Sequence, residues 1–230
     1  MTETLPKIFC AIDTPDLDQA VSLIRALSAA GCGVKLGLEF FSAHGPQGVR
    51  NIMEKCGRPP VFLDLKYHDI PNTVAGAVRA ASDLGVVYLN VHASGGLEMM
   101  RAAKEACAPG VRLLAVTILT SLDEQAIAKI GYQEGIESRV RQMALLTQEA
   151  GLDGIVCSAR EVALVRDACG PDFILMVPGI RPAGSDKQDQ KRSMTPRDAL
   201  REGATHLVIG RPITQADNPA AAAEEILKSL

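Results

Sequence analysis

Eight short apolar segments, most of them followed by a helical pattern, constrain the fold of this 230-residue chain more than any other feature. Repeated strand–helix units place their strands parallel, in a sheet that is buried on both faces. Eight units predict a single-domain α/β protein over residues 1–230, a closed (β/α)₈ TIM barrel; an open doubly wound sheet is the competing arrangement. The predicted strands occupy residues 7–13, 33–38, 61–66, 86–92, 112–119, 154–157, 173–177 and 206–209.

The segments between these strands predict helices and contain no nucleotide-binding glycine motif. Helices are expected at residues 17–30, 40–56, 73–84, 97–107, 159–168 and 219–227, with others before residue 150 and a short one from residue 195. No G-x-G-x-x-G or G-x-x-x-x-G-K-[ST] loop follows any strand. A dinucleotide-binding or nucleoside-triphosphate fold is therefore disfavoured.

The composition is that of a globular protein and argues against several classes of partner. Hydrophobic residues make up 47% and charged residues 22% of the chain, which excludes a disordered protein. A net charge of −3 and an aromatic content of 3% argue against nucleic acid and anionic membranes as partners. With no membrane-length apolar run and no signal-peptide pattern, we expect a cytoplasmic protein. The six cysteines lack C-x-x-C spacing and are expected to be reduced core residues.

The predicted strand at residues 61–66 carries charges where a buried strand would be apolar. Asp64 and Lys66 are two residues apart and therefore point to the same face of the strand. Burying these charges costs several kcal/mol unless they pair or bind a ligand. Asp69 follows the strand, and Ile70-Pro71-Asn72-Thr73 then breaks the strand and begins a helix. Asn72 or Thr73 is expected to be the N-cap of this helix. Taken alone, this pattern fits a structural ion pair as well as it fits a catalytic site.

Polar residues also interrupt or follow other predicted strands. Asp13 ends the first strand, Lys35 lies in the second, Thr120 follows the fifth and Arg211 follows the eighth. Taken singly, Asp13 fits a helix cap and Lys35 fits a lysine that extends its ammonium to solvent. Because the carboxyl ends of barrel strands meet at one rim, the residues together predict a shared site there.

Two segments near the C-terminus predict a grip for a phosphate group. Gly210, directly after the last strand, frees backbone N–H groups for an anion, and Arg211 can clamp that anion with two hydrogen bonds. The long polar loop at residues 179–193 contains Arg181 and Gln190, and we interpret it as a lid over a ligand. A solvated arginine beside an ordinary turn is the alternative. The four histidines share no metal-ligand spacing, so no metal site is expected.

These motifs resemble the orotidine 5′-phosphate decarboxylase family. The resemblance is carried by Asp13, Lys35, Asp64-Leu-Lys66-Tyr-His-Asp69-Ile-Pro-Asn-Thr73, Leu119-Thr-Ser121, Pro178-Gly-Ile-Arg-Pro182, Asp189-Gln190 and Ile209-Gly-Arg-Pro212. The motifs occur in the family's order and cover nearly the whole chain. The resemblance implies a (β/α)₈ homodimer that removes CO₂ from orotidine 5′-monophosphate to give UMP, the last step of pyrimidine synthesis, without a metal or an organic cofactor.

The resemblance also implies a role for each matching residue. A charged catalytic array is implied for Lys35, Asp64 and Lys66, to which Asp69 of the neighbouring subunit adds a carboxylate, with Ile70 and Thr73 reaching across beside it. Substrate contacts are implied for Asp13 at the ribose, Thr120 at the pyrimidine, and Arg181, Gln190 and Arg211 at the phosphate. By these roles, each site takes residues from both subunits.

The chemistry of the residues is consistent with this activity. Loss of CO₂ from a ring carbon with no adjacent electron sink leaves a localised carbanion, which an ammonium at Lys66 can stabilise and protonate. Asp64 keeps that lysine charged and repels a carboxylate facing it, by roughly 4 kcal/mol at ~4 Å and an effective dielectric of about 20. This repulsion accounts for only a minority of a large rate enhancement. We therefore expect the binding energy of the phosphate, acting through closure of the lid, to supply another part of it.

Two rival functions stay open from the sequence. Sugar-phosphate decarboxylases and aldolase-like synthases also use D-x-K-x-x-D, but they bind Mg²⁺ with a Glu from the second strand, where this chain has Lys35. A cation beside Asp64 would hinder metal binding. The second rival is a barrel that binds a nucleotide without turning it over, and the intact Lys66 argues against it.

Overall fold

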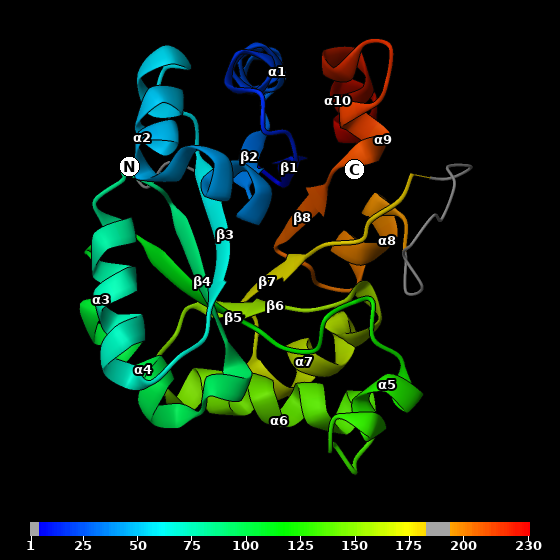
Figure 1. The fold of residues 1–230 in the computed structure, drawn as a ribbon. Helices are drawn as coiled ribbons and strands as arrows, with labels where there is room; N and C mark the ends of the chain where they lie inside the picture. Colours follow the sequence, from blue (N-terminus) through cyan, green and yellow to red (C-terminus); the bar gives the residue numbers. More distant parts are fainter. Residues whose placement is uncertain (1–4, 183–193) are drawn as a thin grey trace.

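The eight strands close into a parallel barrel in which β1 pairs with β8 (Figure 1). This computed structural model describes residues 5–182 and 194–230. The strands are β1 Ile8–Ile12, β2 Gly33–Leu36, β3 Val61–Tyr67, β4 Tyr88–His92, β5 Arg112–Val116, β6 Gly154–Val156, β7 Ile174–Val177 and β8 His206–Ile209. The (β/α)₈ barrel predicted from the sequence is confirmed, and the open sheet is excluded.

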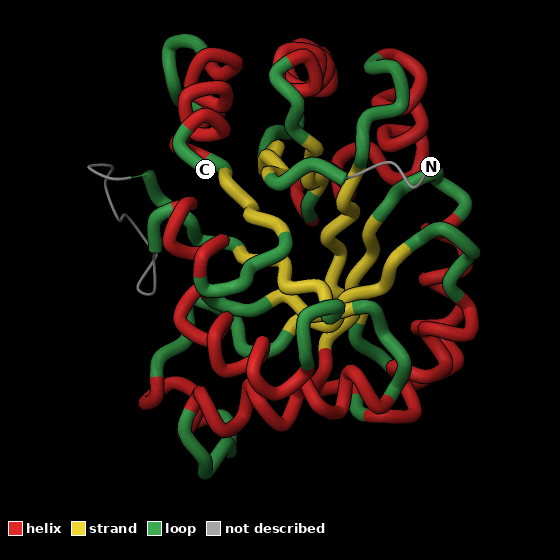
Figure 2. The backbone as a smooth tube through the Cα atoms, turned by 180° about the vertical axis from the view of Figure 1, so that it is seen from behind, coloured by secondary structure: helices red, strands yellow, loops and turns green. Residues whose placement is uncertain are grey.

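Helices surround the strands on the outside of the barrel (Figure 2). The α-helices are α1 Leu17–Ala29, α2 Leu38–Lys55, α3 Pro71–Ser82, α4 Leu97–Ala106, α5 Glu124–Lys129, α6 Ile136–Glu149, α7 Val162–Cys169, α8 Pro196–Arg201, α9 Arg211–Thr214 and α10 Pro219–Lys228. Single 3₁₀ turns, η1 Ala93–Gly95 and η2 Ala159–Glu161, precede α4 and α7. Within the described ranges, no helix has the length and apolar character needed to cross a membrane. All six cysteines are free thiols, as expected.

Alternation along the strands divides the core into two parts. Outward side chains such as Ile8 and Cys10 pack against the helices, whereas inward ones such as Phe9 and Phe62 fill the barrel. The inner cluster consists of Phe9, Ala11, Phe62, Tyr88, Leu114, Met176 and Val208. The next inward position along β3 after Phe62 is Asp64, so polar side chains begin where this apolar filling ends.

The start of α3 differs from the sequence prediction. The helix begins at Pro71, and Ile70 holds the N-cap position with an extended backbone and no side-chain cap. Proline suits the first helical position because its fixed φ matches the helix and its missing N–H would have no partner there. The predicted cap at Asn72 or Thr73 is therefore wrong.

Near its end, strand β3 loses regular pairing with β4. Leu63 pairs with Leu89 and Tyr67 with Val91, so four steps along β3 correspond to two along β4, which is a β-bulge in β3. Within this bulge Lys66 has a φ of 51°, in the left-handed region. A non-glycine residue there costs on the order of 1 kcal/mol and persists only when its surroundings hold it. Bulges re-aim side chains, and this one lies directly under the barrel mouth.

The opposite end of the barrel holds a group that we call the barrel floor: Tyr88, Arg112 and His206, joined by hydrogen bonds, and Phe9, which packs against two of them. His206 Nδ1 donates to the Pro6 carbonyl oxygen at 2.7 Å, because a carbonyl can only accept. His206 Nε2 then accepts from the Tyr88 hydroxyl at 2.8 Å, and Arg112 donates to that hydroxyl oxygen at 3.1 Å. Phe9 packs edge-on against both rings. Burial lowers the pKa of His206 to about 4, so its ring is neutral near pH 7.

Candidate active site

Four side chains of alternating charge, Asp13, Lys35, Asp64 and Lys66, form a charged array inside the barrel mouth. The Lys66 ammonium nitrogen lies 2.7 Å from Asp64 Oδ1, and that of Lys35 lies 3.3 Å from Asp64 Oδ2. Lys35 also reaches Asp13 Oδ1 at 3.7 Å. The four residues come from the ends of β1, β2 and β3, which are neighbours in the barrel. The structure therefore brings these four predicted site residues into one place.

Asp64 is ionised although its carboxylate is buried. Burial is the largest single influence and by itself would raise the pKa of this carboxyl. The charges of Lys35 and Lys66, with hydrogen bonds from Lys66 and Asn90, together outweigh burial and hold the pKa of Asp64 below its usual value. The carboxylate therefore stays negative between two ammonium groups.

The local alternatives for Asp13 and Lys35 do not match the structure. The N-cap of α1 is Asp16, whose Oδ1 accepts hydrogen bonds from the backbone N–H groups of Asp18 and Gln19 at 2.9 Å. Asp13 is thus no helix cap. The Lys35 side chain is only 12% exposed, and its ammonium lies within the array rather than in solvent.

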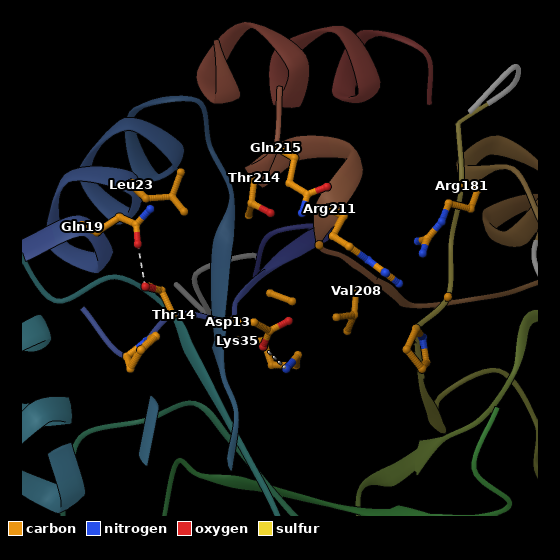
Figure 3. A pocket seen from close by; sticks show the side chains of 15 residues that line it. Asp13, Thr14, Gln19, Leu23, Lys35, Arg181, Val208, Arg211, Thr214 and Gln215 are labelled. Carbon is orange, nitrogen blue, oxygen red and sulfur yellow. Dashed lines mark hydrogen bonds and ion pairs between the residues drawn. The ribbon is translucent and has the colours of Figure 1, made fainter. Parts of the chain in front are cut away.

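A cavity of about 630 Å³ opens beside the array, next to β1, β8 and the segment after β7. Figure 3 shows Arg211 and Arg181 reaching into this hollow from two sides, with Asp13 and Lys35 below them in the view. Gly210, between β8 and α9, lines it with backbone alone. Two guanidinium groups around a glycine backbone form a suitable environment for a phosphate. We call this space the two-arginine cavity.

A second, smaller cavity of about 160 Å³ lies directly over Asp64 and Lys66. Its walls are mostly apolar, and Thr120 lies among the lining residues. The two cavities share Lys35, Pro178 and Val208 in their walls, so they adjoin each other. The lining residues are Lys35, Phe62, Asp64, Lys66, Val116, Ile118, Leu119, Thr120, Val156, Cys157, Pro178 and Val208. This apolar cavity and the two-arginine cavity suit a ligand with a flat ring at one end and an anion at the other.

The predicted residues Asp69, Ile70 and Thr73 are not among those that line the two cavities of their own chain. All three are exposed, Ile70 to 66%. The Asp69 carboxylate accepts a hydrogen bond from the N–H of Ile70 at 2.6 Å. Gln190 and most of the predicted lid at residues 179–193 lie outside the described residues.

Asn90 contacts the array and was missed by sequence reasoning. It is fully buried on β4, where its Nδ2 donates to Asp64 Oδ1 at 2.7 Å and its Oδ1 accepts from the backbone N–H of Lys66 at 2.8 Å. The available signal was its position two residues after Tyr88, on an inward face where an amide needs partners. Also missed were further polar residues of the two-arginine cavity: Thr14, Gln19, Thr214 and Gln215.

Two histidines, His68 and His92, follow or end strands β3 and β4 on the mouth side of the barrel. The rings of His68 and His92 have centroids 5.5 Å apart, and burial, followed by the neighbouring His68 and Lys66, lowers the pKa of His92. Across residues 5–182 and 194–230, no group of three or more His, Cys, Asp or Glu side chains is arranged to hold a metal ion.

The fold and the mouth define a class of protein: a (β/α)₈ barrel with a lysine–aspartate array beside a two-arginine cavity. The sequence profile of the Orotidine 5'-phosphate decarboxylase / HUMPS family matches residues 6–226. The chain belongs to this family, which confirms the resemblance seen in the motifs.

Individual relatives agree with the profile over nearly the full length. The orotidine 5′-phosphate decarboxylase of Moorella thermoacetica is 54% identical over 229 residues, covering 96% of this chain and 90% of its own. That of Nitrosococcus oceani is 52% identical over 223 residues, covering 96% and 95%. The crystal structure of the Lactobacillus acidophilus enzyme of that name superimposes with a TM-score of 0.85 at 34% identity, covering 97% and 98%.

Proposed function

We propose that this protein is an orotidine 5′-phosphate decarboxylase, which converts orotidine 5′-monophosphate to UMP and CO₂ in the last step of pyrimidine synthesis in the cytoplasm. The observation that carries the proposal is the Lys66 ammonium, held 2.7 Å from buried Asp64 and facing an apolar cavity that adjoins the two-arginine cavity. Relatives of this name at 52% and 54% identity support the choice of substrate.

Lys66 acts on the negative charge that develops at C6 of the pyrimidine. As the carbon–carbon bond breaks, its electron pair stays on the ring carbon while CO₂ departs. An ammonium fixed in a water-poor site stabilises such a charge more strongly than water does, because it needs no reorganisation. The same group then donates its proton to the carbon, which completes the uracil ring.

Asp64 acts on the substrate carboxylate and on the lysines. Its ionised carboxylate lies beside the apolar cavity, so a substrate carboxylate bound next to Lys66 also lies close to Asp64. The repulsion of roughly 4 kcal/mol expected at about 4 Å disappears when neutral CO₂ forms. Asp64 also stays between Lys35 and Lys66, so its negative charge favours the ammonium form of Lys66 until that proton passes to the ring carbon.

The phosphate end of the substrate binds in the two-arginine cavity. Arg181 and Arg211 supply paired donors there, and Gly210 lets the backbone approach the phosphate oxygens. Binding energy gained at this remote group holds the pyrimidine against the array and lowers the barrier to reaction. Gln190 and the predicted lid complete this grip in our proposal.

The protein acts as a homodimer in this proposal, with each active site completed by the partner subunit. Asp69, Ile70 and Thr73 are exposed at the mouth side and line neither cavity of their own chain. An Ile at 66% exposure beside a polar loop is typical of a contact surface. Asp69 would thus add its carboxylate to the neighbouring array.

A Mg²⁺-dependent sugar-phosphate enzyme on a related plan is the second candidate. The position on β2 that faces Asp64 holds Lys35, whose ammonium lies 3.3 Å from the carboxylate, and this argues against such an enzyme. A divalent cation at Asp64 would have to displace this lysine. Turnover of orotidine 5′-monophosphate that persists in excess EDTA supports the metal-independent enzyme, and loss of turnover supports the rival.

Substitution of Lys66 tests the proposed function directly. We expect Lys66→Ala to lower kcat for orotidine 5′-monophosphate by 10⁴-fold or more, because proton donation and charge stabilisation each contribute about 10²–10³-fold. UMP binding, measured by calorimetry, should survive. The matched control is Lys104→Ala, which removes a lysine 2.6 Å from Asp153 outside the barrel and should leave kcat unchanged. A Lys66→Ala enzyme with more than a hundredth of native kcat would refute the proposal.

Mixed subunits test the shared site. Lys66→Ala and Asp69→Ala chains should each be nearly inactive alone. In a hybrid dimer one of the two sites contains both native groups, so unfolding and refolding an equimolar mixture should restore about a quarter of native activity by random pairing. If mixing restores nothing although size-exclusion chromatography shows dimers, Asp69 does not act across the interface.

A further inference from the structure

We propose that Asn90 is a positioning residue for the reaction: its side-chain amide sets both the backbone of Lys66 and the carboxylate of Asp64. Asn90 lies on β4, one strand away from the residues it would hold. The inference rests on the proposed decarboxylase activity and adds to it a residue that does not itself touch the substrate cavities.

The first contact that supports this role is to the backbone of β3. The Asn90 Oδ1 accepts the N–H of Lys66 at 2.8 Å, at the point where β3 bulges away from β4. In a regular parallel ladder, backbone carbonyls of the neighbouring strand take such N–H groups. The amide of Asn90 replaces that backbone partner. It thereby stabilises the left-handed φ of 51° from which the Lys66 side chain departs toward the mouth.

The second contact is to the catalytic carboxylate. The Asn90 Nδ2 donates to Asp64 Oδ1 at 2.7 Å, and the same oxygen accepts from the Lys66 ammonium at 2.7 Å. The other oxygen, Oδ2, faces Lys35 at 3.3 Å. With donors on both sides, the carboxylate cannot rotate without losing a contact. One amide thus fixes the two groups whose separation defines the array.

Only an amide of this length makes both contacts. The oxygen must face an N–H and the nitrogen must face an ionised carboxylate, so the two ends of the amide cannot be exchanged. A leucine would fill the space with neither contact. A carboxylate would still accept from Lys66 but would repel Asp64 until it took up a proton. These differences separate a positioning role from simple core filling.

The test compares Asn90→Leu and Asn90→Asp by kcat, KM and the dependence of kcat on pH. We expect Asn90→Leu to lower kcat by about 10²-fold at every pH, as for loss of a preorganised donor, with KM and UMP affinity within about threefold of native. We expect Asn90→Asp to lose as much at high pH and to regain at least tenfold as the pH falls, because a protonated carboxyl at position 90 can again donate to Asp64. The titratable groups around position 90 are Asp64 and Lys66, which Asn90 contacts, Lys35 on the far side of the Asp64 carboxylate, and His92 on the same strand. The pH profile of native enzyme is the reference for the change at position 90.

The matched control removes a different buried polar contact. Thr147 is fully buried in α6 and donates to the Met143 carbonyl at 2.7 Å, far along the chain from the array. Thr147→Val should leave kcat and its pH profile native. Native enzyme that releases no CO₂ from orotidine 5′-monophosphate would sink the proposed function itself. Active native enzyme with Asn90→Leu within threefold of native kcat would overturn the positioning role alone.

The inference remains testable even if one variant fails to fold. If Asn90→Leu fails to fold, the pH profile of Asn90→Asp decides: recovery of kcat toward acid supports positioning, and a profile parallel to native overturns it. A variant that binds UMP more weakly in proportion to its loss of kcat overturns it as well, because that pattern indicates general distortion of the site. Circular dichroism and thermal unfolding on each variant identify the folded fraction used in the comparison.

Discussion

The two ends of the barrel interior both bury polar side chains, and they do so in opposite ways. At the barrel floor, Tyr88 and His206 are neutral, and each hydrogen bond joins one donor to one acceptor. At the mouth, ionised Asp64 lies between the ammonium groups of Lys35 and Lys66. Neutral hydrogen-bonded groups are inexpensive to bury, whereas the attraction within a buried ion pair often fails to offset its loss of hydration.

This difference shows which end is built for stability and which for a ligand. The floor joins Tyr88 to His206 and Arg112 by hydrogen bonds, ties His206 to the Pro6 carbonyl, and packs Phe9 against the Tyr88 and His206 rings. The mouth keeps charges together and holds Lys66 at a strained φ of 51°, next to two cavities. Backbone strain and a buried carboxylate with a shifted pKa at the same place are typical of functional sites. Changes at the mouth should therefore affect activity, and changes at the floor should affect unfolding.

Among the substitutions that compare the two ends, the largest effect is expected from Asp64→Asn at the mouth. The change removes the negative charge between Lys35 and Lys66, and with it both the charge balance of the array and the repulsion of the substrate carboxylate. We expect kcat to fall by about 10³-fold, since electrostatic groups of this kind contribute 10²–10³-fold each. Steady-state assays of CO₂ release measure it. Asp153→Asn, which alters the ion pair with Lys104, is the control, and a variant keeping a tenth of native kcat contradicts the assignment.

The next effect is a dependence of stability on pH that comes from the floor. Because the pKa of His206 is lowered to about 4, the unfolded chain takes up a proton near pH 6.5 that the folded chain refuses. Stability is therefore full above pH 6.5 and falls as the pH drops toward 4, by up to roughly 3 kcal/mol. Asp64, whose pKa lies below its usual value, adds a loss in the same direction toward the acid end of this window, where its carboxyl in the unfolded chain begins to take up a proton.

Urea unfolding between pH 7 and pH 4 measures this slope. His206→Asn keeps a donor for the Pro6 carbonyl and has no titrating ring, so its stability should change less with pH over the same range. An equal slope in native and variant protein would place the acid sensitivity elsewhere in the molecule.

The smallest effect is expected from Tyr88→Phe, also at the floor. Loss of the hydroxyl leaves His206 Nε2 and Arg112 without this partner, which should lower the free energy of unfolding by about 2 kcal/mol. The kcat of the folded enzyme should stay within twofold of native. Tyr132→Phe makes the same chemical change outside the barrel and serves as the control. A tenfold loss of kcat in Tyr88→Phe would contradict the claim that the floor contributes to stability and the mouth to activity.

The sequence predicted the strands because buried parallel strands are apolar throughout, and it predicted most of the array because Lys35, Asp64 and Lys66 break that pattern. Strand ends were harder to predict. Residues 117–119 favour a strand, yet β5 ends at Val116 because the neighbouring β6 itself ends at Val156. Beyond this point the ladder has no partner to continue it.

The contact between Asn90 and the array was not predictable for a related reason. A buried asparagine on an inward strand position indicates that a partner exists, but not which one. Its partners depend on the register of β3 against β4. That register shifts between Leu63 and Tyr67, and no sequence pattern predicts the shift. The joining of the two cavities likewise depends on side-chain volumes from strands far apart in the chain.

The bulge in β3 also sets a condition for protein engineers who would transplant this chemistry to a new scaffold. Copying only the D-x-K segment onto a regularly paired strand would keep both side chains on one face but would lose the left-handed φ of Lys66 and the Asn90 amide that holds its backbone. The smallest portable module is instead two adjacent strands with their irregular junction, Asp64 and Lys66 on one and Asn90 on the other.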